Sequence, residues 1–525
     1  MVADIINTDN LLKLFYKEKE ESKKYKLLYN RYYALYNGSL KSLENKEKNT
    51  ENRIKEAVDK ATEDLQKQLK EKNAEIALLR AQLNNNSSNS GIPTSRTPIG
   101  EKKKIPNTRK KSGRKKGGQK GHKRHKLEKF ADDQIDEVIT HDPGVAKCDR
   151  CGSDLTLIDT VYKDEYRLMI KVLHIRHAFN IYECTNCHKT FKVEIPENLK
   201  EDNQYGSSVQ AMAAVMMNEG YVSMNRTAEI MSDLTDHELC LSDGFLAKIN
   251  KRLAKNLNDF YNDLKREVIR LSVLHWDDTT ISIGGSNAII RFYGNEKLAL
   301  YYAHSNKNME SLDDDGILIS LDKDTVVVHD HLTLNYNPKF DFQNAECGIH
   351  LIRRLTKSKE TTNHEWQQTL IGLLLAANDS KKKGSEIDVR QLYDDYDKIV
   401  KDGKKINKDD KDNPFWEKEK RFLNDLITYK DAYLLYATRA DVPFTNNTAE
   451  KAIRLEKIRC KVSGQFTNLD RAQDHAVIRS YQETGKRFGY NLFELCQRAI
   501  NGDVVSFEEM KKHASKDKTC SFKMD

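Results

Sequence analysis

Residues 273–279 read VLHWDDT, and the predicted core of the fold begins with this segment. Its apolar, β-rich beginning predicts a strand that ends at or near Asp277. Residues 326–331 read VVVHDH and repeat the arrangement, because three valines lead to Asp330. Both segments therefore place an aspartate at the edge of a strand, where two neighbouring strands can bring their carboxylates together.

A third segment, residues 446–454, reads NNTAEKAIR and opens a helix near Glu450. Two aspartates on strands and a glutamate on a later helix form an oxygen-rich site of the kind that binds Mg²⁺ or Mn²⁺. Such a site can hold two metal ions about 4 Å apart and stabilise the attacking and leaving oxygens of a phosphodiester. We therefore predict Asp277, Asp330 and Glu450 as catalytic metal ligands for phosphoryl transfer on nucleic acid.

Each acid also has an explanation that needs no metal. Asp277 and its neighbour Asp278 fit a turn after a strand, and Asp330 fits a strand end. Glu450 follows Asn447 by three residues, the spacing of a capping box in which Asn447 is the N-cap and Glu450 the N3 residue. The joint placement of the three acids favours catalysis, with Asp278 and Asn447 as secondary candidates.

The hydrophobic pattern after residue 274 predicts an α/β core. Period-two alternation indicates three strands, over 280–283, 288–293 and 299–303. A helix over 309–318 and a further strand over 325–328 follow. This order, with aspartates on the first and fourth strands, is that of a ribonuclease H-like fold. We divide the chain from residue 271 onward into four parts: the first part of the core (271–345), a helical insertion (346–440), the catalytic helix with the completion of the core (441–500) and a C-terminal tail (501–525). Within the insertion, helices are predicted over 365–375, 389–400 and 416–427.

The chain of 525 residues is too long for one core and predicts a multidomain α+β protein. No apolar run approaches the length of a membrane span, and the first residues lack the pattern of a secretory signal. The first 85 residues are charged and helical in pattern, and apolar positions in residues 54–83 keep a 4-3-4 spacing with one interruption. Residues 1–85 are therefore predicted to form a coiled coil that makes a homo-oligomer, or else one amphipathic helix packed on its own chain.

The net charge of +8 conceals a strongly basic segment. Residues 101–130 hold 14 Lys or Arg against 2 Glu, with glycines between them. Cations with flexible backbone can follow a phosphate backbone independently of base sequence. We assign residues 86–135 as a basic flexible linker that contacts DNA, although a solvated tail is the alternative; the candidate DNA-binding residues are Arg114, Lys115, Lys116 and Lys120.

Four of the nine cysteines form two Cys-x-x-Cys pairs in residues 136–200. Four thiolates complete a closed tetrahedral Zn²⁺ site, so we predict a structural zinc-ribbon-like module. The gap between the pairs is long, and His174, His177 or His188 could replace one cysteine. The β-rich residues 166–182 are expected to supply hairpins; the predicted ligands are Cys148, Cys151, Cys184 and Cys187.

Two further regions carry weaker signals. Residues 201–270 contain successive helix starts and fit either a helix-turn-helix-like DNA reader or a helical spacer. Arg454, Lys457 and Lys461 fall near one face of the helix that begins close to Glu450, where they can contact the DNA backbone, the alternative being a solvated charged face. Cys347 and His350 have the spacing of half a metal site but are expected mainly to pack or position the core.

The chain resembles transposases of the insertion sequence 66 family, a bacterial group with an aspartate-aspartate-glutamate site. The matching segments keep the family's order and cover nearly all of the chain after Ser87: residues 113–122, the two cysteine pairs, 275–279, 328–331, 347–354, 444–454 and 462–466. One departure is Asp278, where the family usually has glutamate after its first aspartate. Asp278 is therefore a candidate substitute for Asp277.

The resemblance implies a DNA transposase of an insertion sequence, in a bacterial cytoplasm and associated with the nucleoid. Cleavage at the element's ends frees a 3′-hydroxyl, and this hydroxyl attacks target DNA in the same site. The expected partners are terminal inverted repeats, target DNA, a second copy of the chain and small accessory transposition proteins. The alternatives are a transposase-derived DNA-binding protein without catalysis and a ribonuclease H-like nuclease without joining.

Overall fold

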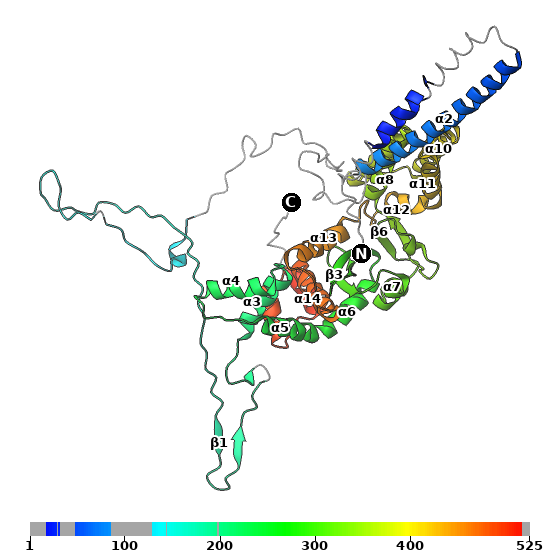
Figure 1. Ribbon diagram of the computed structural model, residues 1–525. Coiled ribbons are helices and arrows are strands. Elements are labelled where there is room, and N and C mark those ends of the chain that lie inside the picture. Colours follow the sequence, from blue (N-terminus) through cyan, green and yellow to red (C-terminus); the bar gives the residue numbers. More distant parts are fainter. Residues whose placement is uncertain are drawn as a thin grey trace.

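The computed structural model describes residues 17–28, 30–31, 48–85, 129–142, 144–196 and 199–516 (Figure 1). The four predicted DNA-binding residues of the basic segment, from Arg114 to Lys120, lie outside these ranges. Within them the chain is a mixed α+β protein in which one sheet is surrounded by helices. No helix in these ranges is long and apolar enough to cross a membrane.

Five strands form the central sheet, in the spatial order β5-β4-β3-β6-β7. The first three strands along the chain form an antiparallel meander, and β6 and β7 then pair in parallel, β6 with β3 and β7 with β6. This topology is consistent with a ribonuclease H-like core. Their bounds are β3 (Val273–Ile283), β4 (Ser286–Gly294), β5 (Ala299–His304), β6 (Val326–His329) and β7 (Gln343–Glu346).

Both faces of the sheet are covered by helices, as its strands require. One face of β3, β4 and β5 packs against α13 (Asn447–Val462) and α14 (Leu469–Arg487). The other face packs against α6 (Asn258–Ile269) and α7 (Met309–Asp315). Such two-sided burial explains why β4 and β5 are buried along most of their length rather than on alternate residues only.

Helix α14 also closes the free edge of the sheet. Backbone amides of the edge strand β5 donate to side chains of α14: Ala299 to Thr484 (3.2 Å), Tyr301 to Ser480 (2.9 Å) and Ala303 to Gln473 (3.0 Å). An unpaired strand edge is a site of unwanted strand addition. The polar residues of α14 therefore satisfy this edge and fix α14 against the core.

A group of helices precedes the sheet: α3 (Ser207–Asn218), α4 (Met224–Leu234), α5 (Asp243–Asn256) and α6. Ser223 and Ser242 cap α4 and α5 by accepting from Arg226 N and Phe245 N, as Ser at an N-cap typically does. At the C-terminal end, α15 (Leu492–Ile500) packs on α3, and α16 (Phe507–Lys516) buries Phe507 and Met510. Part of the expected tail is thus a helix seated in the core.

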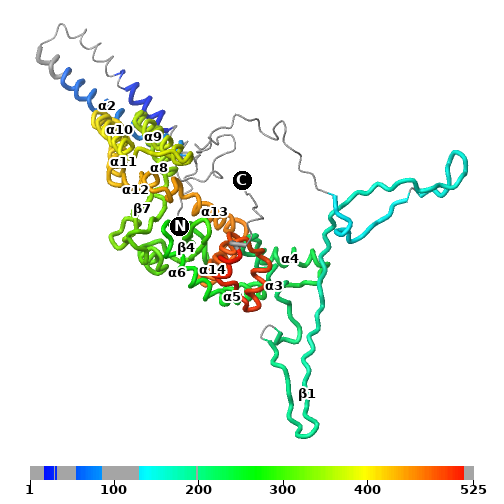
Figure 2. Tube along the Cα trace, turned by 180° about the vertical axis from the view of Figure 1, so that it is seen from behind, coloured from blue at the N-terminus to red at the C-terminus, as the bar shows by residue number. Residues whose placement is uncertain are grey.

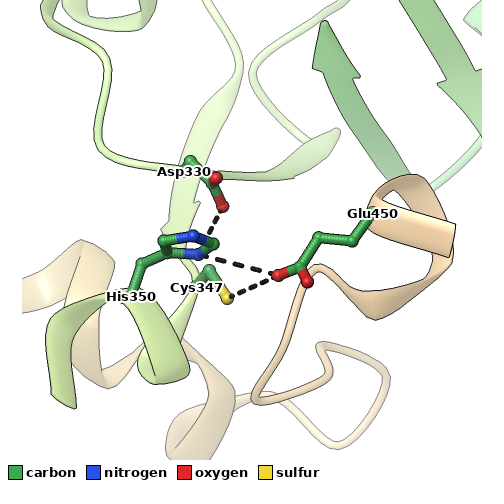
Figure 3. Close-up of side chains that lie close together, drawn as sticks. All are labelled: Asp330, Cys347, His350 and Glu450. Carbon is green, nitrogen blue, oxygen red and sulfur yellow. Dashed lines mark hydrogen bonds and ion pairs between the residues drawn. The ribbon is translucent and has the colours of Figure 1, made fainter. Parts of the chain in front are cut away.

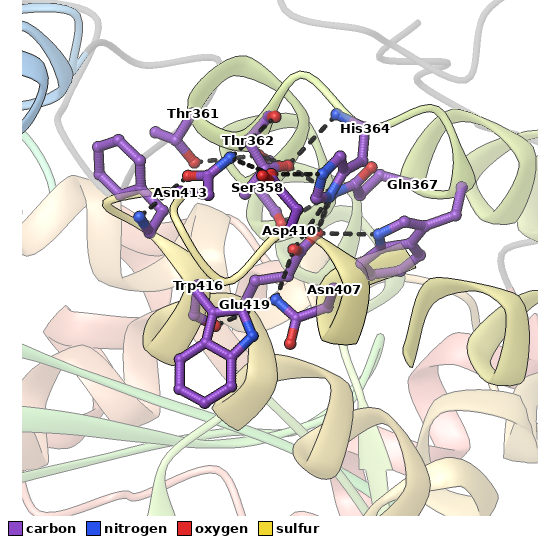
Figure 4. Close-up of polar contacts among 12 residues, drawn as sticks. Ser358, Thr361, Thr362, His364, Gln367, Asn407, Asp410, Asn413, Trp416 and Glu419 are labelled. Carbon is purple, nitrogen blue, oxygen red and sulfur yellow. Dashed lines mark hydrogen bonds and ion pairs between the residues drawn. The ribbon is translucent and has the colours of Figure 1, made fainter. Parts of the chain in front are cut away.

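Between β7 and α13 the chain forms five helices: α8 (Gly348–Thr362), α9 (Trp366–Lys382), α10 (Val389–Asp409), α11 (Trp416–Thr428) and α12 (Lys430–Thr438). They enclose a hydrophobic core of their own that continues into β6. A polar network holds the far end of this insertion together (Figure 4). At its centre the buried carboxylate of Glu419 accepts hydrogen bonds from Trp366, Gln367 and Asn407, at 2.9 Å each.

The described residues of the N-terminal part, 17–28, 30–31 and 48–83, are helical, as predicted. Helix α2 (Lys48–Leu83) lies beside the helical residues 17–28, with Lys72 Nζ 3.4 Å from Glu18 Oε2. Figure 1 shows α2 reaching the insertion, where Lys70 pairs with Asp412 at 2.5 Å. These contacts fit the alternative of a helix packed on its own chain, while the predicted coiled coil with a second copy stays a prediction.

Residues 129–196 extend away from the sheet and helices in both views (Figure 2). Their only strands among the described residues are β1 (Ile181–Glu183) and β2 (Thr190–Lys192), which pair as an antiparallel hairpin. The prediction of hairpins within residues 166–182 is therefore wrong, because the hairpin lies at residues 181–192. The apolar side chains that suggested them are exposed here, for example Leu168 and Leu173, so no packing selects a strand.

Candidate active site

Asp277 lies inside β3 rather than at its end, which corrects the expected strand boundary. The period-two pattern that predicted a separate strand over 280–283 belongs to the same strand, which is 11 residues long. However, the parallel pairing of β3 with β6 ends at His275 and Val328. Asp277 therefore stands just past the point where the two parallel strands separate.

Asp277 and Asp278 point to opposite faces of the sheet because adjacent strand residues alternate. Asp277 is opposite Phe292, on the face covered by α13 and α14, whereas Asp278 is opposite Arg291 on the other face. There Asp278 pairs with Lys307 at 2.6 Å. Asp278 is thus separated from the other predicted acids by the sheet itself.

Asp330 directly follows β6, and Glu450 lies in the first turn of α13. Helix α13 begins at Asn447, its N-cap is Asn446, and no side-chain cap bond forms. The proposed capping box between Asn447 and Glu450 is therefore wrong. The Glu450 side chain is not used in a cap and is directed toward the end of β6.

Asn446 is a site residue that the sequence did not identify. Its side-chain amide donates to Trp276 O at 2.8 Å, and its Oδ1 lies 3.0 Å from His275 Nδ1. Asn446 is fully buried, so these bonds attach the start of α13 to the strand that carries Asp277. The two consecutive asparagines at the start of α13 were the available signal in the sequence. The capping-box spacing led to Asn447 being chosen as the N-cap instead of Asn446.

Four side chains converge where β6, α8 and α13 meet (Figure 3). His350 Nδ1 lies 2.8 Å from Asp330 Oδ1 and 3.7 Å from Glu450 Oε1, and Cys347 Sγ lies 3.9 Å from the same Glu450 oxygen. One ligand atom from each residue falls within 4.8 Å of the others. The secondary candidates Cys347 and His350 are thus brought together with two of the three predicted acids.

Burial and charge act strongly on this group. Burial and, after it, the nearby charge of Asp330 raise the pKa of Asp277 to about 7, with smaller contributions from the charges of Asp278 and Glu450. Burial lowers the pKa of His350, but the contacts with Asp330 and Cys347 together outweigh burial and raise the pKa to about 11. Clustered carboxylates with a perturbed pKa are typical of functional sites.

The donor set fits a hard divalent cation. Asp330 and Glu450 offer carboxylate oxygens on adjoining elements, and the carboxylate of Asp277 is close enough for both to affect its pKa. Mg²⁺ and Mn²⁺ prefer such oxygen ligands, and a cation would offset the mutual repulsion of the acids. Cys347 and His350 add softer atoms within the same group.

The two cysteine pairs form matching turns. In the first, Gly152 N donates to Cys148 O and Cys148 N to Ser153 O; in the second, His188 N donates to Cys184 O and Cys184 N to Lys189 O, at 2.9 Å each. Gly152 and His188, at the same place in the two turns, both have positive φ.

These turns suit thiolates. A hydrogen bond with Ser153 lowers the pKa of Cys151, and backbone hydrogen bonds, first that of Cys187, lower the pKa of Cys184. Thiolates on such turns fit Zn²⁺. In the described ranges, however, the four sulfur atoms are not gathered into one group.

Arg454, Lys457 and Lys461 are exposed along α13. None of the three has a carboxylate within salt-bridge distance among the residues that the structure describes. They remain free to meet a ligand near the acids.

Comparison with known protein families identifies the chain. The model of the Transposase IS66 family, a DDE transposase domain, matches residues 202–474, which is more than half of the chain. The matched region contains Asp277, Asp330 and Glu450 but not the cysteine pairs. A search of curated proteins gives no match. With the sheet topology and the converging acids, this match shows that the chain belongs to the IS66 family of transposases.

Proposed function

We propose that this transposase catalyses metal-dependent cleavage at the ends of an insertion sequence and strand transfer into target DNA. The observation that carries the proposal is the approach of Asp330 and Glu450, from β6 and α13, to within 4.8 Å as ligands, with Asp277 beside them on β3. Residues separated by more than a hundred positions meet at one point. The DDE family supports phosphoryl transfer as the chemistry.

In this proposal Asp277, Asp330 and Glu450 hold Mg²⁺ or Mn²⁺. Two such ions would polarise the phosphodiester and stabilise its attacking and leaving oxygens. His350 orients Asp330 through the 2.8 Å bond, and Asn446 holds Glu450 in register with β3. We give Asp278 no role as a ligand because it faces the other side of the sheet.

The other modules have proposed roles in binding DNA and assembling the complex. The cysteine turns would hold Zn²⁺ and present residues 136–200 to the terminal inverted repeats. The basic segment 86–135 and the cations of α13 would contact the phosphate backbone. Helix α2 would join two copies of the chain, which pair the two ends of the element, and small accessory transposition proteins would complete the assembly.

The test is a strand-transfer assay with Mg²⁺ and oligonucleotides that carry the inverted repeats flanking the gene. Wild-type protein is expected to cleave and join, whereas Glu450→Gln should do neither and still bind DNA. Glu310→Gln is a matched control, because Glu310 lies in the first turn of α7 and is exposed. The control should join at the wild-type rate.

Each alternative has its own outcome in this assay. Binding by the wild type without cleavage or joining would make the protein a DNA-binding protein derived from a transposase. Cleavage without joining would make it a nuclease. Joining by Glu450→Gln would remove Glu450 from the active site.

A further inference from the structure

A second concave, positively charged site lies apart from the acids. It is a groove of about 870 Å³ between α5, α6, the end of β5 and the start of α14. Five cations line it, together with two aromatic residues: Lys248, Lys251, Arg252, Lys255, Lys265, Tyr261 and Tyr302. Helices α5 and α6 belong to residues 201–270, for which the sequence left open a helix-turn-helix-like DNA reader or a helical spacer, and none of these cations was among the predicted DNA-binding residues.

Four of the cations form one stripe on α5. Lys248, Lys251, Arg252 and Lys255 follow the spacing i, i+3, i+4, i+7, which places them on one side of a helix. All four are exposed, and in the part of the chain that the structure describes no carboxylate lies within salt-bridge distance of them. On the neighbouring α6, by contrast, Arg266 pairs with Asp263, and Arg270 pairs with Glu267 at 3.0 Å.

The floor of the groove holds a cation with no anionic partner. Lys265 Nζ stands 5.4 Å from the ring centre of Tyr302, and the side chain is half-buried. Burial lowers the pKa of Lys265, since its ammonium group loses water without gaining a carboxylate at salt-bridge distance among the described residues. A cation held in this way is costly until an anion arrives.

Two acids also line the groove but do not cancel its charge. Asp474 pairs with Arg471 at 2.8 Å, so its charge is already countered, and Asp259 is exposed at the rim. The five lining cations therefore leave a clear positive excess. The stripe on α5 covers about 10 Å, from seven residues at 1.5 Å each.

The groove lies near the catalytic strand but across the sheet from the acids. Tyr302 on β5 is opposite Arg291 on β4, and Arg291 is opposite Asp278 on β3. Two strand spacings, about 10 Å, therefore separate the groove floor from the strand of Asp277.

We propose that this groove binds the sugar–phosphate backbone of duplex DNA and holds the flank of the DNA whose end lies in the active site. A stripe of about 10 Å matches several phosphates of a duplex, which carries one charge per about 1.7 Å of its axis. Backbone contacts of this kind position DNA without reading its sequence. The choice of DNA as the polyanion rests on the proposed function.

The test measures binding without catalysis. The full chain is titrated, in EDTA, against a short fluorescein-labelled duplex of arbitrary sequence, and anisotropy gives the affinity at several salt concentrations. Lys251→Gln/Arg252→Gln should lower the affinity about 10-fold, and the slope of log K against log salt should fall by about 2. A second variant, Lys265→Met, removes the floor cation and should weaken binding in the same direction.

The matched control is Lys404→Gln/Lys405→Gln, which removes two exposed cations from α10 in the insertion. It should bind as the wild type does. Circular dichroism would establish that each variant is folded. If both groove variants keep the wild-type affinity and slope, or if the control is weakened equally, the groove is not a DNA site. If the wild type neither cleaves nor joins DNA in the strand-transfer assay but still binds DNA through the groove, only the proposed function is overturned.

Discussion

The acids Asp277, Asp330 and Glu450 come from three elements of a packed core, whereas the two cysteine pairs lie on short turns in an exposed segment. In the core, the sheet, α8 and α13 hold the acids in position before any ligand binds. In the cysteine segment, local hydrogen bonds shape each turn, but little packing joins one turn to the other. The proposed catalytic site is therefore arranged without its metal, whereas the proposed zinc module would need its metal to join the two turns.

The largest expected effect is a difference in activity between substitutions of two adjacent acids, Asp277 and Asp278. Asp277→Asn should reduce cleavage and joining by roughly 1,000-fold or more, because it removes a ligand of the catalytic metal. Asp278→Asn should change the rate by less than about 3-fold, since this acid pairs with Lys307 on the other face of the sheet. Rates from the strand-transfer assay decide between them, and equal losses would contradict the alternation on β3.

A smaller effect is expected from the residue that orients Asp330. His350→Ala should raise the Mg²⁺ concentration that gives half-maximal activity by about 10- to 100-fold, as loss of a ligand's hydrogen-bond partner usually does. His350→Asn keeps a donor near the position of Nδ1 and should restore part of the loss. An unchanged Mg²⁺ requirement in His350→Ala would show that the 2.8 Å contact has no positioning role.

The cysteine segment should respond differently from the core. Cys148→Ser/Cys151→Ser is expected to lose bound zinc and to bind the element's ends about 10-fold more weakly, because the two turns are no longer joined. Limited proteolysis should then cut residues 136–200 faster, while thermal unfolding of the core stays unchanged. Cys240→Ser is the control, as Cys240 is exposed and outside both pairs. Full zinc content in the double variant would contradict the assignment.

The smallest effect concerns stability in the absence of metal. Because the pKa of Asp277 is about 7 in the folded chain and near 4 when unfolded, the folded state keeps a proton that the unfolded state releases. The free energy of unfolding should therefore decrease as pH rises from about 4 to about 7, by up to about 1.4 kcal/mol per pH unit. Urea denaturation in EDTA should give a shallower pH dependence for Asp277→Asn. Identical slopes would show that Asp277 ionises normally.

Much of the core could be predicted because its elements follow local rules. The valines before Asp330 and the alternating residues of β4 and β5 predicted strands that the structure has. The insertion helices were predicted from their helical periodicity, although each continues beyond its predicted end. Strand β7 was missed, since its sequence QNAE is polar and becomes a strand only by pairing with β6.

The sequence alone was enough to identify the candidate residues, which are three acids and two cysteine pairs, and to indicate the family to which the chain belongs. Side-chain type and spacing are local properties, so they can be read without a fold. Three relations became visible only in the tertiary structure. Asp277 and Asp278 face opposite sides of the sheet, Asn446 bonds the start of α13 to β3, and His350 lies between Asp330 and Glu450. These relations depend on strand register and helix packing, which distant parts of the chain determine together.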